Sequence, residues 1–337
     1  MYILKATPET VRWGNFDKSK EPVLTIRSGD IVSMELLSHR AGDAPDLMMD
    51  EGVKEIYQQV KQRTPGCHII TGPIAIEGCK QGDVLECKVL DLQPRLAYGS
   101  NFMIGKGLLH EEFKNEQQVV IYKADTNTGR AKADFMFPYD NKLVGPGAVM
   151  EPGLYPRKPA LANVQVPLRF HIGVAGVAPD QQGGVNTGLP GIYGGNIDNR
   201  NFIVGTSMYY PVQVDKGFFM AGDPHFAQGD GEINGTAIEG HLNAVLQLSI
   251  KKNLKINNPV LETPTCWIVH ALHSDLNEAT RLAALEAVHF LESNQGLSRP
   301  EAYSLLSVAG DFAITQAVNQ LKGVHVSISK DLFPDKG

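Results

Sequence analysis

An eleven-residue segment, 222–232, constrains this chain most, because it holds three carboxylates and one imidazole among three glycines and one proline. Glycine and proline at this density bar a regular helix, so the segment must turn. Oxygen and nitrogen donors on a turning backbone suit a divalent cation held in a shaped loop. A second polar segment, 194–200, lies upstream, and a single histidine, His68, lies further upstream. We expect a hydrolytic metal site assembled from segments that are distant in the sequence.

The charge balance argues against some classes of partner. The 337 residues include 31 Lys and Arg against 37 Asp and Glu, for a formal charge of −6. Because no Lys/Arg cluster supplies a strong positive field, we expect no nucleic-acid partner and no membrane partner. We see no secretory signal and no apolar run of membrane-spanning length, which predicts a cytoplasmic protein. The length suits one large or two medium domains.

The cysteines do not form a metal-binding or disulfide motif. Cys67, Cys79, Cys87 and Cys266 show no C-x-x-C pair and no dense spacing, which favours small buried hydrophobes. Cys67 stands beside His68, so a nucleophilic thiol has to be considered. Adjacent residues on a strand point to opposite faces, and we therefore expect these two side chains to diverge.

Alternation of apolar and polar residues predicts many short strands. A Gly-Asp pair at 29–30 and another at 82–83 each precede a segment with one apolar face. The predicted strands cover residues 31–36, 84–89, 119–122, 170–174, 202–210, 218–221, 244–250 and 324–328.

Helical spacing appears early once and then in the last quarter of the chain. Asp275 followed by Glu278 indicates one helix start, and Ser298 followed by Glu301 forms a capping-box pattern at another. The predicted helices cover residues 52–62, 276–290, 298–309 and 312–319. Strands early and helices late indicate a β-rich α+β protein with helices packed on the outer faces of β-sheets.

A loop or linker is predicted at 145–159, which holds four prolines and three glycines. It separates a β-rich N-terminal portion, 1–150, from a portion, 151–337, with the acidic segments and the C-terminal helices. We expect the two portions to share an interface, because His68 lies in the first and Asp223 in the second. A single compact unit is the alternative.

Several segments together resemble one known family. They are GNID at 195–198, GDPHFAQGDGE at 222–232, AIE at 237–239, His68 with TGPI at 71–74, EG at 77–78, GDVL at 82–85 and SLLSVAGDFAITQAVN at 304–319. The sequence resembles the acetamidase/formamidase family over most of residues 65–330, and segment 222–232 is its most specific part.

The resemblance implies hydrolysis of a small amide to a carboxylate and ammonia or an amine, by attack of a metal-activated water. It also implies two packed β-sheets flanked by helices, in layers of the α/β/β/α kind, and a homodimer or higher homo-oligomer. The substrate would be like formamide or acetamide, or a cyclic amide such as a γ-lactam, since some members have been described as lactamases. The implied cofactor is Zn²⁺ or a similar divalent cation, with Ca²⁺ as an additional candidate.

Four residues are candidate metal ligands. Asp223 and His225 stand two apart, so an extended backbone places both side chains on one face. Asp198 is a third candidate, although an aspartate that orders a glycine-rich turn is the alternative. The family resemblance makes His68 a ligand, whereas a buried core histidine is its other interpretation. His39 is a weaker candidate that would bind substrate or lie on the surface.

The remaining candidates would act on the substrate. Asp230 and Glu232 share a face if the chain is extended there, so one would be a ligand and the other the general base; we favour Glu232 as the base. A hairpin turn is the alternative for Asp230. Glu239 would orient a ligating histidine or replace the base. Gly195 and Asn196 would supply an oxyanion site.

Two rival functions remain open at this point. The first is a thiol amidase that uses Cys67 as its nucleophile. The second is a non-enzymatic calcium-binding β-sandwich module, against which the imidazole argues because Ca²⁺ prefers oxygen ligands.

Overall fold

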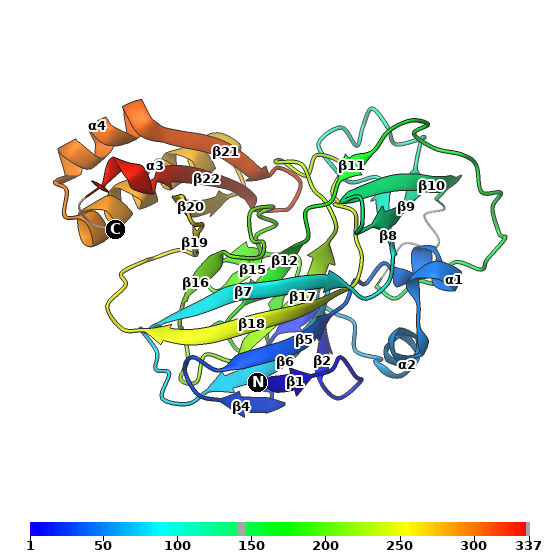
Figure 1. The fold of residues 1–337 in the computed structure, drawn as a ribbon, viewed down its shortest axis with the longest axis horizontal. Helices are drawn as coiled ribbons and strands as arrows, with labels where there is room; N and C mark the ends of the chain where they lie inside the picture. Colours follow the sequence, from blue (N-terminus) through cyan, green and yellow to red (C-terminus); the bar gives the residue numbers. More distant parts are fainter. Residues whose placement is uncertain (140–145, 335–337) are drawn as a thin grey trace.

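Two large β-sheets face each other at the centre of the protein (Figure 1). The structure is a computed structural model that describes residues 1–139 and 146–334. The first sheet contains, in order across it, β1 (Tyr2–Leu4), β5 (Ile31–Leu36), β18 (Leu242–Lys251), β7 (Val84–Pro94), β16 (Ser207–Pro211), β19 (Val260–Glu262), β20 (Cys266–His273), β22 (Lys322–Ser329) and β21 (Gly310–Gln316). The second contains β14 (Pro190–Gly191), β15 (Gly194–Asn196), β12 (His171–Gly176), β17 (Phe219–His225), β6 (Ile69–Ile76) and β2 (Val11–Trp13), with β4 (Leu24–Ile26) paired to β6.

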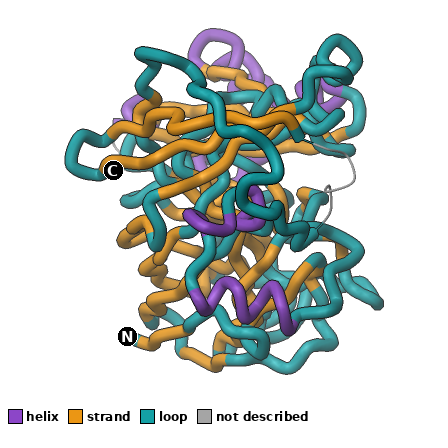
Figure 2. The backbone as a smooth tube through the Cα atoms, turned by 90° about the vertical axis from the view of Figure 1, so that its right-hand side faces the viewer, coloured by secondary structure: helices purple, strands orange, loops and turns teal. Residues whose placement is uncertain are grey.

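Smaller elements surround this pair of sheets. A third sheet contains β11 (Val166–Pro167), β10 (Arg130–Pro138), β9 (Gln118–Asp125) and β8 (Tyr98–Met103), and a short ribbon pairs β13 (Val185–Asn186) with β3 (Asn15–Phe16). The α-helices are α1 (Pro45–Met48), α2 (Glu51–Gln59), α3 (Leu276–Phe290) and α4 (Arg299–Ala309). Figure 2 shows that strands and loops make up most of the backbone.

The main core lies between the two large sheets. Alternate residues of β5 are buried, as the apolar face after the Gly-Asp pair predicted. Met34 on β5 and Leu246 on β18 belong to one buried cluster with Ile74 on β6 and Phe219 on β17. Burial of side chains like these contributes roughly 1.5–3 kcal/mol each relative to exposure. This core makes the strands that carry the acidic segment rigid.

The predicted helix starts are confirmed. Asp275 caps α3 and accepts a hydrogen bond from the backbone N–H of Glu278 at 2.9 Å. Ser298 and Glu301 form the expected capping box at α4. Ala283 of α3 is fully buried in a cluster with Val324 of β22, so this helix packs on the far end of the first sheet.

The predicted helix at 312–319 is wrong, because Gly310–Gln316 form the edge strand β21 beside β22. Phe312 and Ile314 are of types that favour strands, and pairing with β22 satisfies backbone groups along this segment. The predicted strand at 202–210 is shorter than expected, since β16 begins at Ser207. The other predicted strands and the helix at 52–62 are confirmed, within a few residues at their ends.

The β-rich α+β class is confirmed, but the described helices do not form two complete outer layers. Helix α3 contacts β20 and β22 only at one end of the first sheet. Helix α2 instead packs into a separate apolar cluster with residues of β9 and β10. A third sheet was also not expected.

Strands from both halves of the sequence pair with each other in each large sheet. β5 and β7 lie beside β18 and β16 in the first, and β6 lies beside β17 in the second. Residues 146–159 form turns and loops, as predicted, whereas Gly145 lies outside the described residues. Among the described residues, no helix combines the length and apolar composition needed to cross a bilayer.

Candidate active site

Strand β17 carries the start of the acidic segment and lies near the centre of the second sheet. Its neighbours are β12, where His171 faces His225, and β6, where Ile70 faces Gly222. Every residue of β17 is buried. The Asp223 carboxylate and the His225 imidazole therefore lie inside the protein, with Oδ2 of the first 3.2 Å from Nε2 of the second. Buried charges of this kind require a partner.

Further carboxylates gather around His225. Glu239 faces it through an isolated β-bridge, and Oε2 of Glu239 lies 3.4 Å from Nε2 of His225. Asp223, His225 and Glu239 have ligand atoms within 4.8 Å of one another. Asp198, His225 and Glu232 form a second group by the same measure. His225 belongs to both groups and is the centre of the arrangement.

Several carboxylate oxygens at this centre have no hydrogen-bond partner. They are Oδ1 of Asp198, Oδ1 of Asp223 and Oε2 of Glu239. A buried polar atom without a partner costs about 1–3 kcal/mol, and a charged one costs more. A divalent cation among these oxygens would remove that cost. The residues present therefore fit a metal site with mixed oxygen and nitrogen donors.

The backbone is strained at three of these acidic residues. Asp198, Asp223 and Glu232 have φ values of 54°, 50° and 46°. Residues other than glycine rarely adopt this left-handed region, and each such residue costs about 1–3 kcal/mol. Strain of this kind concentrates at functional sites, where the surrounding fold imposes the side-chain direction.

His171 and Gln228 fix the tautomer of His225. The carbonyl of Arg169 lies 2.7 Å from Nδ1 of His171 and can only accept, so this nitrogen donates. Nε2 of neutral His171 is then an acceptor, 3.1 Å from Nδ1 of His225. Oε1 of Gln228 lies 3.0 Å from the same Nδ1. His225 therefore carries a proton on Nδ1, which leaves Nε2 directed at the carboxylates.

Burial shifts the pKa values of two acids upward. Burial raises the pKa of Asp198 to about 7, and the nearby Asp223 contributes in the same direction. Burial, together with Asp198, raises the pKa of Glu232 well above its ordinary value. Both carboxyls therefore retain protons more readily than free acids do, in a protein without a cation at this position.

Asp223 and His225 behave as an ion pair instead. Burial alone would raise the pKa of Asp223, but the imidazoles of His68 and His225 outweigh it and lower this pKa. Burial would lower the pKa of His225, but Glu239 and Asp223 outweigh it and raise this pKa. Asp223 is therefore the carboxylate that stays negative at this centre.

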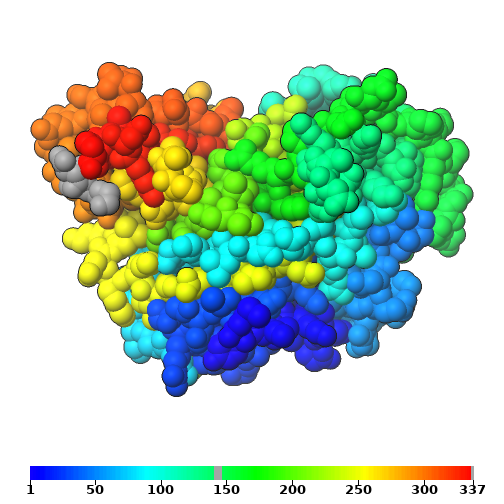
Figure 3. Space-filling view, in the orientation of Figure 1, coloured from blue at the N-terminus to red at the C-terminus, as the bar shows by residue number. Residues whose placement is uncertain are grey.

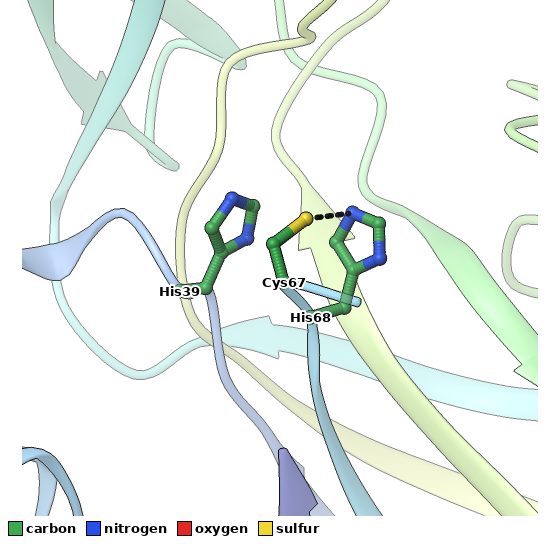
Figure 4. A group of neighbouring side chains, drawn as sticks. All are labelled: His39, Cys67 and His68. Atoms are coloured by element: carbon green, nitrogen blue, oxygen red, sulfur yellow. Dashed lines mark hydrogen bonds between the residues drawn. The ribbon is translucent and has the colours of Figure 1, made fainter. Parts of the chain in front are cut away.

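A thiol and two imidazoles form a neighbouring group, shown in Figure 4. Sγ of Cys67 lies 3.4 Å from Nε2 of His68, and the rings of His39 and His68 meet edge to face at 5.0 Å. The expectation that Cys67 and His68 diverge is wrong, because β6 begins only at Ile69 and strand alternation does not apply before it. Burial would raise the pKa of Cys67, but His68 and His39 outweigh it and lower this pKa.

One cavity of about 590 Å³ is lined by this group and by the carboxylates around His225, although His225 itself does not line it. Phe102 of β8 and Asn319 of the loop between β21 and β22 also line it. The cavity therefore lies between the third sheet and the C-terminal hairpin, which occupy the two upper corners of the surface in Figure 3. The volume suits a small molecule beside a metal site.

Of the remaining candidate residues, the structure places some at the cavity or the carboxylate groups and others away from them. Asn196 lines the cavity and its buried Oδ1 has no hydrogen-bond partner, whereas Gly195 is buried within β15. Asp230 is exposed and belongs to neither carboxylate group. Oε1 of Glu239 accepts a hydrogen bond from the backbone N–H of Ala237 at 2.9 Å, which orients this carboxylate.

Sequence reasoning left two contributors unassigned. His171 reaches His225 only through the pairing of β12 with β17, which no local pattern indicates. Asn319 donates to Oδ2 of Asp198 at 3.3 Å from the far end of the chain. The sequence around Asn319 suggested a helix, so this contact was not predictable from it.

Comparisons with known proteins identify the family of this chain. The model of the acetamidase/formamidase family matches residues 12–184 and 181–334. The chain is similar to a formamidase of Methylophilus methylotrophus, with 28% identity over 72% of this chain and 70% of the relative. It is also similar in structure to an acetamidase of Bacillus halodurans, with a TM-score of 0.77, 28% identity and 99% of each chain covered.

A γ-lactamase of Delftia acidovorans shares the fold, with a TM-score of 0.60 and 20% identity over 97% of this chain and 90% of the other. Because the family model spans most of the sequence, the non-enzymatic interpretation is set aside. The chain belongs to the acetamidase/formamidase family and is an amide hydrolase of that family.

Proposed function

We propose that this protein hydrolyses a small amide at the His225 centre, with the help of a divalent cation. The substrate would be formamide, acetamide or a compact cyclic amide such as a γ-lactam. The observation that carries the proposal is the convergence of buried carboxylates on Nε2 of His225, with Oδ2 of Asp223 at 3.2 Å and Oε2 of Glu239 at 3.4 Å. Three carboxylate oxygens at this centre have no hydrogen-bond partner.

The donor set favours Zn²⁺ or a similar cation. Asp198, Asp223 and His225 would hold it, with Glu239 close enough to contribute. His225 has ligand atoms within 4.8 Å of Asp198 in one group and of Asp223 and Glu239 in the other. Mixed carboxylate and imidazole donors are typical of Zn²⁺, whereas Ca²⁺ takes oxygen donors. Such a cation lowers the pKa of water and polarises the amide carbonyl.

Glu232 is the proposed proton carrier. Its carboxyl group is buried at the cavity wall, and burial raises its pKa, which makes a carboxylate more basic and better able to take a proton from water. Glu232 would accept a proton from the attacking water as the C–O bond forms. It would return this proton to the nitrogen as the C–N bond breaks, which releases ammonia or an amine and leaves a carboxylate.

Other residues of the cavity would orient the substrate. The side chain of Asn196 lies at the wall with Oδ1 unsatisfied, so it is suited to accept a hydrogen bond from an amide N–H. Phe102 and Ile104 supply apolar surface that excludes water from the reacting atoms.

The proposal is tested with purified protein by elemental analysis together with ammonia release from formamide and acetamide and ring opening of a γ-lactam. Close to stoichiometric metal and reversible loss of activity on chelation are expected. His225→Ala should lose the metal and the activity. Full turnover by metal-free protein would overturn the proposal.

A thiol mechanism is a second candidate, which the 3.4 Å contact between Cys67 and His68 favours. In that case alkylation of Cys67 would abolish turnover while chelation would not. The metal mechanism predicts that chelation abolishes turnover, so the two treatments applied in parallel separate the candidates.

A further inference from the structure

The group of His39, Cys67 and His68 has no role in the proposed reaction, although it lines the same cavity. Each of the three residues offers a ligand atom within 4.8 Å of the others. His39 and His68 are 9% and 7% exposed, so both are at least nine-tenths buried. Nδ1 of His39 has no hydrogen-bond partner, and Nε2 of His68 is the ring nitrogen that faces Sγ of Cys67. A buried imidazole atom without a partner calls for a ligand that the neighbouring side chains do not supply.

Asp223 lies between this group and the His225 centre. Its Oδ1 is 3.8 Å from Nδ1 of His39. Its Oδ2 is 3.7 Å from Nε2 of His68 and 3.2 Å from Nε2 of His225. One carboxylate therefore faces imidazoles on two sides, as a carboxylate shared by two cations does in metal pairs.

We propose that His39, Cys67 and His68 bind a second divalent cation, which shares Asp223 with the cation at His225. This inference deepens the proposed function, because it makes the site a pair of cations bridged by one carboxylate. His68 then belongs to the second cation.

The donor chemistry distinguishes the two positions. A thiolate with two imidazoles is a soft set that selects Zn²⁺ or Co²⁺ over Mg²⁺ or Ca²⁺. The His225 centre has mainly carboxylate oxygens and is the harder of the two. With the shared Asp223, these three residues complete the four-ligand set that Zn²⁺ takes in proteins, at the wall of the cavity.

Cobalt reports on the thiolate directly. Full-length protein would be stripped of metal, reloaded with Co²⁺ under a non-thiol reductant and separated from free ion. Two equivalents of Co²⁺ are expected, together with the near-ultraviolet charge-transfer absorption of a cobalt–thiolate bond. Cys67→Ser should lose this absorption and one equivalent while it keeps the other.

Two variants make the result specific. His225→Ala should keep the charge-transfer absorption and lose the other equivalent. Cys266→Ser is the matched control, since Cys266 begins strand β20 and does not line the cavity, and it should bind Co²⁺ like the parent. Cys67→Ala repeats the test with a residue that cannot ligate, and thermal unfolding checks that each variant is folded.

The outcomes separate this inference from the proposed function. The second cation would be overturned, and the first kept, by the following result. The parent protein binds one equivalent of Co²⁺ without thiolate absorption, and only His225→Ala loses this metal. A parent with both equivalents retained in Cys67→Ser would also overturn it. If His225→Ala shows the thiolate absorption and binds as much Co²⁺ as the parent, the Cys67 cation is kept and the metal assignment of the proposed function is overturned. A parent that binds no Co²⁺ would overturn both.

Discussion

Nε2 of His171 lies 3.1 Å from Nδ1 of His225, and the two residues face each other across strands β12 and β17. Burial, together with His225, lowers the pKa of His171 to about 3, so this ring stays neutral and its Nε2 accepts a hydrogen bond from Nδ1–H of His225. A residue outside the cavity thus determines which nitrogen of His225 is available to a cation.

Replacing His171 should weaken metal binding without removing a ligand. His171→Phe keeps a ring in the core but leaves Nδ1–H of His225 with Gln228 alone, and loss of such a partner typically lowers metal affinity by about 10–100-fold. Competition with a chelator would measure this affinity. His325→Phe changes a buried histidine outside the cavity and should bind metal like the parent; equal loss in both variants would contradict the assigned role.

Gly173 leaves space that the site requires. A Cβ atom at this position would lie 2.5 Å from Cε1 of His225 and 2.8 Å from Oδ1 of Asp198. Gly173→Ala should therefore displace a ligand, and we expect loss of metal together with an overpacking cost of about 1–3 kcal/mol in the free energy of unfolding. Gly229→Ala is the control in the acidic segment, since a Cβ there meets nothing within 4 Å. Full metal content in Gly173→Ala would contradict the expectation that the added Cβ atom displaces a ligand.

Glu232→Gln should separate proton transfer from metal binding. The amide keeps the shape of the side chain and cannot accept a proton, so activity should fall about 10²-fold or more while metal is retained. Elemental analysis and ammonia release on the same sample would measure both quantities. Asp311→Asn, at an exposed carboxylate, should change neither. Loss of metal in the Glu232 variant would instead make Glu232 a ligand.

His270 should make the fold sensitive to acid. Nδ1 of His270 lies 2.8 Å from the Pro259 carbonyl and Nε2 lies 2.8 Å from Nδ2 of Asn199, while burial and His325 lower its pKa from 6.5 to about 3. The unfolded chain therefore binds a proton that the folded chain does not, and the free energy of unfolding falls as pH drops from about 6.5 toward 3. A single group contributes at most about 1.4 kcal/mol per pH unit to this slope.

Urea unfolding at several pH values would measure this slope. His270→Gln removes the titrating ring and should flatten the slope between about pH 6.5 and pH 4. His110→Gln changes an exposed histidine and should leave the slope unchanged. A His270→Gln slope equal to that of the parent would mean that other groups account for the acid sensitivity.

Local signals in the sequence predicted those parts of the fold that local interactions determine. Asp275 and the Ser298–Glu301 pair mark helix starts because a side chain satisfies backbone N–H groups a few residues away. Segment 312–319 lacks such a start signal, and its pairing with β22 depends on residues beyond it. The apolar spacing there fits a helix as well as a strand, so only the tertiary pairing decides between them.

The site was predictable where the donors themselves are unusual. Asp223, His225 and Glu232 stand in one short segment, and the structure brings them together with Asp198. Cys67 and His68 were interpreted as strand residues, and the position at which β6 begins was not readable from their neighbours. His39 joins them only because the end of β5 lies close to β6 and β17, which is a property of the packed sheets.

The pairing of β6 with β17 also has a consequence for the order of events during synthesis. The ribosome releases His39, Cys67 and His68 long before Asp223 and His225. β6 can pair with β2 and β4 at once, but its partner β17 is far along the chain. A nascent chain that ends before β17 therefore holds the thiol and two imidazoles without the carboxylates that neutralise a cation. Such a chain exposes soft donors to any thiophilic ion in its surroundings. Under the proposed pair of cations, the complete donor set exists only after the second half of the chain has been translated and β17 has paired with β6.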